Sequence, residues 1–158
     1  MLTTKNQYSY KGKFREGVVF AFYKDGKILI EHRPDAKGGT GKDVFFTNGS
    51  IEMKDHGKDQ DYRIVAHNRE VNEEFDGNIV PTDTRYLGEL EVPEINLVFY
   101  VYLTLGWEGT MPAYTIEEGK KFADLEWIEL DRQSEYFKYP SAFTICDMIG
   151  KYIVWVNI

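Results

Sequence analysis

The sequence predicts a mixed α/β or α+β sandwich, in which helices pack against a β-sheet. Apolar runs rich in β-branched and aromatic residues occur in two groups, and a helical pattern follows each group. Hydrophobic residues make up 42% of the chain and aromatic residues 15%, which excludes intrinsic disorder for the chain as a whole. Because 158 residues are enough for one ordinary core, we expect a single domain over residues 1–158.

The first group of strands begins with residues 17–23 and 28–31. The segment between them contains Asp25 and Gly26, and Asp-Gly between two such runs is a strong signal for a β-hairpin. A loop rich in Gly and Lys is expected at 35–42, and another apolar run follows it, Val44-Phe45-Phe46.

The first helix is expected over residues 62–75. It follows the segment 54–61, which is too polar for a core and is expected to form a surface loop. Gly77 can adopt the left-handed conformation that ends a helix. The apolar positions of this helix recur at spacings of seven and four, which places them on one face: Ile64, Val71 and Phe75.

The second group of strands covers residues 85–92, 95–105 and 124–130. The run at 95–105 is rich in β-branched and aromatic residues, and its length suits a long central strand better than a helix. Pro140 then introduces a second helix over 142–152. Its apolar residues form one stripe: Phe143, Cys146, Ile149 and Ile153.

Charge and cysteine content narrow the classes of function. The chain has 26 Asp and Glu against 19 Lys and Arg, a formal net charge of −7. Such a surface repels a phosphate backbone, so we expect no nucleic-acid duplex as a partner, and a ligand that carries phosphate would need a basic cluster or a bound metal.

Cys146 is the only cysteine, which excludes an internal disulfide and a multi-cysteine metal site. With neither a signal-peptide pattern nor a membrane-length apolar run, we expect a cytoplasmic protein with no membrane partner.

The first helix carries three carboxylates within five residues. Glu70, Glu73 and Glu74 fall within roughly a third of the helix circumference, away from the apolar stripe. Like charges four residues apart destabilise an isolated helix, and a cation would reverse that effect. Clustered carboxylate oxygens suit Mg²⁺, which keeps waters and substrate phosphate oxygens as its other ligands. The alternative for this helix taken alone is a solvated acidic face.

The residues around this cluster resemble the Nudix hydrolase (MutT-like) signature. That signature is Gly, five residues, Glu, seven residues, then Arg-Glu-U-x-Glu-Glu-x-Gly-U, where U is a bulky aliphatic residue. Its central six positions are matched by Arg69-Glu70-Val71-Asn72-Glu73-Glu74. Upstream, residues 46–52 are similar to the strand, Gly-containing turn and strand that lead into the family's helix. The resemblance implies a Nudix-type α/β/α sandwich with a mixed β-sheet.

The sequence departs from the signature in its spacing. Gly49 and Arg69 are 20 positions apart where the signature gives 14, so six extra residues are expected in the polar loop. The position eight before Arg69 holds Asp61, which we expect to face Arg69. Asp76 occupies the position of the last Gly, and Gly77 follows it. The central carboxylates are all kept, and a longer exposed loop costs little free energy.

The resemblance implies a role for each matched residue. Glu73 and Glu74 would be metal ligands, Glu70 a further ligand or the catalytic base, and Arg69 would support the cluster. Three further assignments follow from position in the family pattern: a backbone carbonyl of Asn48 or Gly49 on the metal, Arg33 on a substrate phosphate, and an additional catalytic glutamate, for which Glu118 is favoured over Glu117. The implied cofactor is Mg²⁺, with Mn²⁺ as an alternative.

The leading hypothesis is therefore an Mg²⁺-dependent Nudix pyrophosphohydrolase. Its substrate would be a small nucleotide, either a nucleoside triphosphate, oxidised forms included, or a nucleotide sugar. One alternative is a catalytically weak Nudix-fold domain that binds a nucleotide for regulation, and the lengthened spacing favours it. Another is an unrelated protein with a structural acidic helix. The sequence leaves a homodimer open.

Overall fold

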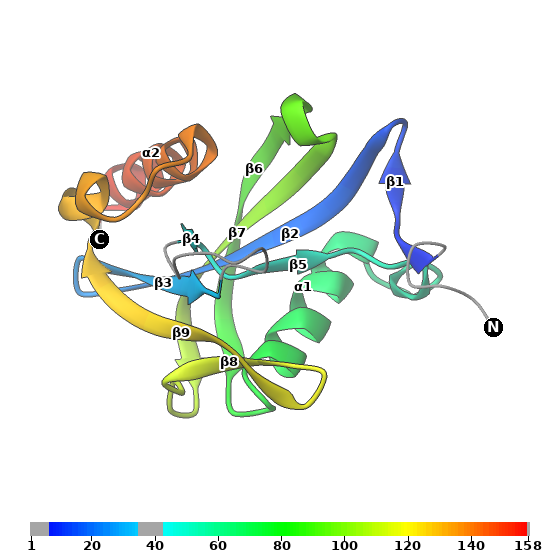
Figure 1. Cartoon of the computed structure of the whole chain (residues 1–158), viewed down its shortest axis with the longest axis horizontal. Coiled ribbons are helices and arrows are strands. Elements are labelled where there is room, and N and C mark those ends of the chain that lie inside the picture. Colours follow the sequence, from blue (N-terminus) through cyan, green and yellow to red (C-terminus); the bar gives the residue numbers. More distant parts are fainter. Residues whose placement is uncertain (1–6, 35–42, 158) are drawn as a thin grey trace.

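The computed structural model describes residues 7–34 and 43–157 and shows a curled mixed β-sheet with two α-helices (Figure 1). This confirms the predicted fold class. The expected loop at 35–42 lies outside the described residues. The helices are α1 (Tyr62–Glu74) and α2 (Pro140–Val156). The strands are β1 (Tyr10–Lys11), β2 (Phe14–Lys24), β3 (Lys27–Arg33), β4 (Asp43–Phe45), β5 (Asn48–Ser50), β6 (Val80–Val92), β7 (Leu97–Glu108), β8 (Tyr114–Glu117) and β9 (Lys120–Glu129). Short 3-10 helices are η2 (Met53–Asp55), η3 (Pro93–Ile95) and η4 (Leu130–Glu135).

The strand order is β6-β7-β2-β3-β9-β8, with β1 and β5 paired to β2, and β4 paired to β3. β2 and β7 run parallel, and the other pairs are antiparallel. β2 and β3 pair only beside their turn, where Tyr23 lies opposite Ile28. The two strands therefore separate away from the turn, and β4 and β5 lie along the strands that diverge.

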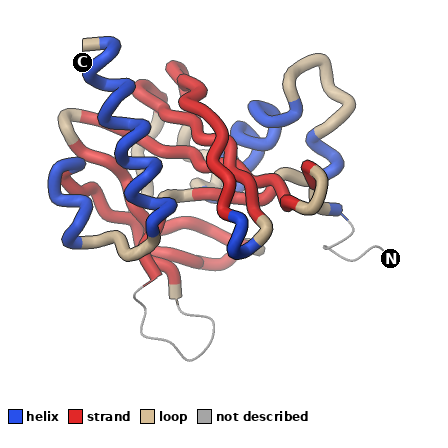
Figure 2. The backbone as a smooth tube through the Cα atoms, turned by 90° about the horizontal axis from the view of Figure 1, so that it is seen from above, coloured by secondary structure: helices blue, strands red, loops and turns tan. Residues whose placement is uncertain are grey.

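The core has two parts, one on each side of β2. Val19 and Ala21 pack on the side covered by α2, whereas Val18, Phe20 and Phe22 pack on the side covered by α1. The two helices lie on opposite sides of the sheet (Figure 1 and Figure 2). Because both of its faces are covered, β2 is a continuous apolar run. Among the residues described, no helix combines the length and the apolar content that crossing a membrane requires.

The structure confirms the expected hairpin and the two helices and changes some boundaries. Asp25 and Gly26 both have positive φ, 52° and 80°, as a two-residue hairpin turn requires. β7 begins at Leu97 because η3 and the left-handed Asn96 come before it. β8, which was not expected, pairs with β9 across a second turn of this kind, at Glu118 and Gly119.

Candidate functional site

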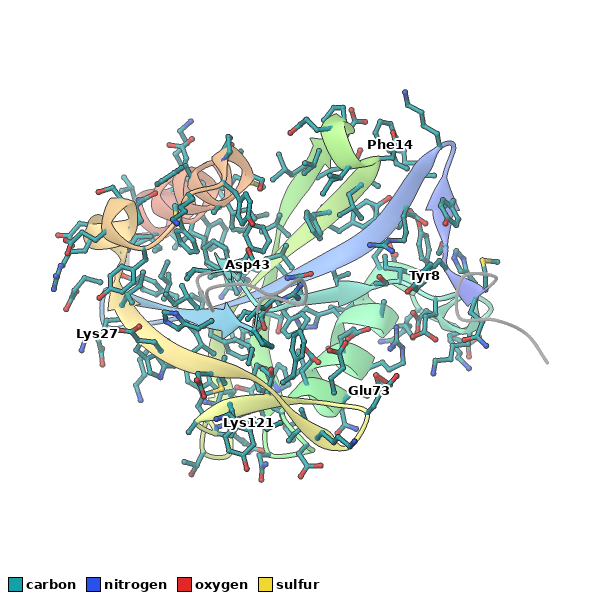
Figure 3. All side chains as sticks on the ribbon, in the orientation of Figure 1. Tyr8, Phe14, Lys27, Asp43, Glu73 and Lys121 are labelled. Atoms are coloured by element: carbon teal, nitrogen blue, oxygen red, sulfur yellow. The ribbon has the colours of Figure 1, made fainter. Side chains whose placement is uncertain are left out.

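Helix α1 places its carboxylates beside, and not within, its apolar face. The helix begins at Asp61, whose Oδ1 accepts a hydrogen bond of 2.9 Å from the backbone N–H of Arg63. Glu70 and Glu74 are 9% and 7% exposed, so both carboxylates are largely removed from water. The side chain of Glu73 is 50% exposed, and Figure 3 shows it on the outer side of α1. The three glutamates therefore extend from the buried flank of the helix to its surface.

Strand β5 contacts this flank through Gly49. A Cβ atom at Gly49 would lie 2.3 Å from the carboxylate carbon of Glu70, so the carboxylate would have to move away from the strand. Glycine is therefore required for the helix carboxylate to lie against the strand backbone. The neighbouring side chain, Asn48, donates a hydrogen bond of 2.9 Å to the carbonyl of Phe46, which fixes the approach to β5.

Arg69 connects the cluster to the segment after β5. Its Nε and Nη2 donate to the two carboxylate oxygens of Asp55 at 2.8 and 2.9 Å, a bidentate pair. Nη2 also donates to the backbone carbonyl of Ser50 at 3.1 Å. Nη1 contacts Glu70 at 3.1 Å and Glu73 at 3.2 Å. One guanidinium group thus fixes two of the three helix carboxylates relative to β5.

A cavity of about 660 Å³ opens beside these groups. Its walls come from β5, α1, the turn between β8 and β9, and two residues near the N-terminal end, Tyr8 and Arg15. Arg69 is not part of its lining and lies behind the carboxylates that it contacts. All the other predicted site residues line the cavity: Arg33, Asn48, Gly49, Glu70, Glu73, Glu74 and Glu118.

The turn between β8 and β9 adds two more carboxylates to the cavity, Glu117 and Glu118. Glu118 and Gly119 have positive φ, 51° and 76°, so the turn is tight. After burial and the charges of Glu31 and Glu70, the negative charge of Glu117 also contributes to the raised pKa of Glu74. Glu118 was favoured from the sequence, and the structure brings both residues to the site.

Comparison with solved structures identifies the fold. A hydrolase described as acting on ADP compounds superposes with a TM-score of 0.65 at 14% identity, covering 87% of this chain and 72% of its own. A MutT Nudix hydrolase from Burkholderia pseudomallei gives 0.62 at 21% identity, with coverages of 85% and 97%. The chain has the Nudix hydrolase fold. The structure of a complex between the mouse MUTYH C-terminal domain and human PCNA also matches, with a TM-score of 0.56, 16% identity, and coverages of 87% and 88%. Scans of the sequence against family models and curated proteins find no match.

One residue that we matched to the Nudix signature, Asp61, does not have the position in the structure that we expected. Asp61 does not face Arg69, because its carboxylate caps α1 and pairs with Arg63 at 2.6 Å. Arg69 pairs instead with Asp55, which is separated from Gly49 by five residues, as the first Glu of the signature is. The extra residues therefore lie between Asp55 and Arg69. The signature spacing counted forward from Gly49 leads to Asp55. Counted back from Arg69 it leads to Asp61, because this count crosses the inserted residues.

Burial and mutual repulsion change the protonation of the cluster. Burial, together with the charges of Glu31 and Glu70, raises the pKa of Glu74 to about 9. Burial also raises the pKa of Glu70 to about 7, although Arg69 acts in the opposite direction. With no cation beside them, Glu74 keeps its proton at neutral pH and Glu70 is partly protonated.

This donor set fits a hard divalent cation. Carboxylate oxygens and a backbone carbonyl are ligands that Mg²⁺ accepts, and a cation would offset the repulsion that raises the pKa values of Glu70 and Glu74. In the part of the chain that is described, no three His, Cys, Asp or Glu side chains converge closely enough to hold a metal ion. Glu70 and Glu73 are instead turned toward Arg69, so metal binding would require their carboxylates to rotate.

Sequence reasoning missed one buried acidic residue of the site, Glu31 on β3. Its side chain is fully buried and accepts a hydrogen bond of 2.5 Å from Nε of Arg33. Its other oxygen, Oε2, has no hydrogen-bond partner among the described residues, and burial raises the pKa of Glu31 to about 7. A charged residue that directly follows the apolar run Ile28-Leu29-Ile30 was the available signal. Glu31 orients Arg33 at the edge of the cavity.

Proposed function

We propose that the chain is a divalent-cation-dependent Nudix pyrophosphohydrolase that cleaves the pyrophosphate linkage of a nucleoside diphosphate derivative. The observation that supports this most directly is the pair of buried carboxylates Glu70 and Glu74, which have raised pKa values and line an open cavity, with Glu70 against the backbone of Gly49. The cavity, about 660 Å³, lies within the range of sites that enclose a small ligand.

The glutamates of the cluster would bind the metal ion, and Arg33 would bind the substrate. Glu73 and Glu74, with Glu70 and a carbonyl of Asn48 or Gly49, would hold Mg²⁺, or Mn²⁺ in its place. When bound, the cation would neutralise the diphosphate and stabilise the negative charge that develops on the bridging oxygen. Arg33 would donate hydrogen bonds to a phosphate oxygen.

The reaction itself is the attack of water on a phosphorus atom and cleavage of its bond to the bridging oxygen. A carboxylate must accept the proton that the water loses. We assign this role to a glutamate of the turn between β8 and β9, Glu117 or Glu118, with Glu70 as the alternative, because both turn residues line the cavity. The expected substrate is a nucleoside triphosphate, oxidised forms included, or a nucleotide sugar.

The test is hydrolysis of a panel of nucleoside triphosphates and nucleotide sugars, with and without Mg²⁺, followed by ³¹P NMR. We expect turnover that requires Mg²⁺ and falls at least 100-fold in Glu74→Gln. The matched control is Glu94→Gln, at an exposed site in η3, which should leave turnover unchanged. A comparison of Glu117→Gln with Glu118→Gln decides between the turn glutamates, since only the base variant should lower kcat strongly.

The alternative function is a Nudix-fold domain that binds a nucleotide without cleaving it. The contacts of Arg69 with Glu70 and Glu73 favour this alternative, because they occupy carboxylates that a cation would need. Nucleotide binding without turnover of any member of the panel would establish it. Full activity in both Glu73→Gln and Glu74→Gln would instead refute the metal assignment.

A further inference from the structure

The cavity is lined by a positively charged side chain, Arg15, that has no role in the proposed chemistry. Among the described residues, its lining includes several carboxylates and two cationic side chains, Arg33 and Arg15. Arg33 is paired with the buried Glu31. Arg15 forms no ion pair within residues 7–34 and 43–157, so its positive charge is not neutralised by a carboxylate. An uncompensated guanidinium in the cavity of an acidic protein requires an explanation.

The side chain of Arg15 is held in place by an aromatic ring. Its guanidinium carbon lies 4.8 Å from the ring centroid of Tyr8. Tyr8 is itself anchored, since it forms a β-bridge with Glu52 and is followed by Ser9, whose N–H donates to the carbonyl of Ile51 at 2.9 Å. Figure 3 shows Tyr8 and Glu73 at separate places on the molecule, and both line the same cavity.

Arg15 also has a buried donor without a partner. Its Nε is inaccessible to water and makes no hydrogen bond with any described residue. Buried donors are normally satisfied, and an orphaned one destabilises the folded state. Nε itself is closed to the cavity, so an anion in the cavity would meet the other nitrogens of the guanidinium, which Arg15 contributes to the lining.

The position of Arg15 relative to the carboxylate cluster suits a chain of phosphates. On β2, Val18 lies opposite Gly49 of β5, and Arg15 is three residues earlier on the same strand. Three residues of a strand span about 10 Å. A phosphate that Arg15 contacts would therefore lie on the Tyr8 side of a diphosphate held at the cluster, within the same cavity.

We propose that Arg15, supported by Tyr8, forms an anion subsite that binds a further phosphate of the substrate, beyond the diphosphate held at the carboxylate cluster. The substrate class is then a nucleoside triphosphate or a longer polyphosphate, in preference to a nucleotide sugar whose sugar is neutral. The choice of substrate rests on the proposed function, but binding of the anion requires no turnover.

The first experiment measures binding of inorganic tripolyphosphate and of pyrophosphate by calorimetry in the presence of Mg²⁺. Since a hydrogen bond to a charged group contributes roughly 10- to 100-fold to affinity, Arg15→Met should weaken tripolyphosphate binding by about that factor and leave pyrophosphate binding nearly unchanged. Arg15→Lys should retain part of the affinity. The matched control, Arg132→Met, removes an exposed guanidinium of η4 that is paired with Glu135 and should change neither value. Thermal melts establish that each variant is folded.

The second experiment separates this inference from the proposed function. The ¹⁵N NMR signal of the Arg15 Nε–H should shift when tripolyphosphate is added, whether or not any nucleotide is hydrolysed. A shift without turnover would refute the hydrolase and retain the subsite. Turnover with an unchanged ratio of kcat/KM between nucleoside triphosphate and nucleotide sugar in Arg15→Met would refute the subsite and retain the hydrolase. Loss of affinity for an unphosphorylated nucleoside alone would show that Arg15 contacts the base, and the inference would be wrong.

Discussion

Replacing Glu74 by Gln should stabilise the protein when no divalent cation is present. Glutamine has nearly the same shape as glutamate and carries no charge, so it removes the cost of burying a carboxylate, and the repulsion from Glu31 and Glu70, without opening a cavity. The pKa of Glu74 is about 9 in the folded state, against an ordinary value of 4.5. Between these values the folded state holds one more proton than the unfolded state, so stability falls as the pH rises through this interval.

The magnitude follows from the same two values. The interval from 4.5 to pH 7, at about 1.4 kcal/mol per unit, sets an upper limit of about 3 kcal/mol on the stability that the protein has lost by pH 7 because folded Glu74 keeps its proton. The protonation of Glu74 is coupled to that of Glu70 and Glu31, so a change at one carboxyl group lowers the cost at the others. We therefore expect Glu74→Gln to raise the free energy of unfolding by about 2 kcal/mol. For a chain of 158 residues this corresponds to a rise in Tm of about 4–8 °C.

The assay is thermal or urea unfolding in EDTA at several pH values, with Glu94→Gln as the control for loss of an exposed charge. The difference between Glu74→Gln and the wild-type protein should be small near pH 5 and grow up to pH 8. Addition of Mg²⁺ should reverse the order, since a ligand at 100 times its Kd stabilises the form that binds it by about 2.7 kcal/mol. A variant that is less stable than the wild-type protein in EDTA at pH 8 would refute the electrostatic reasoning.

Three substitutions around the cluster should also be informative. Gly49→Ala forces a Cβ atom to within 2.3 Å of the Glu70 carboxylate, so we expect a loss of about 1–3 kcal/mol in urea unfolding together with weaker Mg²⁺ binding; unchanged Mg²⁺ affinity would contradict the close approach. Asp55→Asn removes the bidentate partner of Arg69, which keeps its contacts with Glu70 and Glu73, and should cost about 1–3 kcal/mol. Asp61→Asn retains a helix cap and should cost less than about 1 kcal/mol. Equal losses in the two asparagine variants would argue against the pairing of Arg69 with Asp55.

The parts of the fold that were predictable depend on local sequence. The hairpin at Asp25 and Gly26 and the position of α1 follow from turn residues and from apolar spacing, which neighbouring residues determine. The carboxylates of Glu70 and Glu74 were found for the same reason, because one helix presents both. Strand β8 was missed because its four residues carry little apolar signal and depend on pairing with β9.

The rest of the site depends on contacts between distant segments. Asp55 reaches Arg69 across an inserted loop, and the signature spacing cannot show from which end the insertion should be counted. Tyr8 comes to the cavity because it bridges Glu52, which is a tertiary contact. Arg15 lies at the start of a strand, where a charged side chain is usually solvated, so its sequence position gave no sign of the cavity.

The longer spacing of the signature does not displace Arg69, because both ends of the inserted segment are fixed. At its start, the backbone N–H of Glu52 donates to Asp55 at 2.8 Å, and the ring of His56 stacks on Tyr62 at 4.1 Å. At its end, Tyr62 donates to the buried carboxylate of Glu16 on β2, which also accepts from Tyr100. Loop closure varies only slowly with length, so once these ends are anchored the extra residues add little free energy. The arrangement around Arg69 is therefore compatible with either spacing, and the departure from the signature does not by itself argue against catalysis.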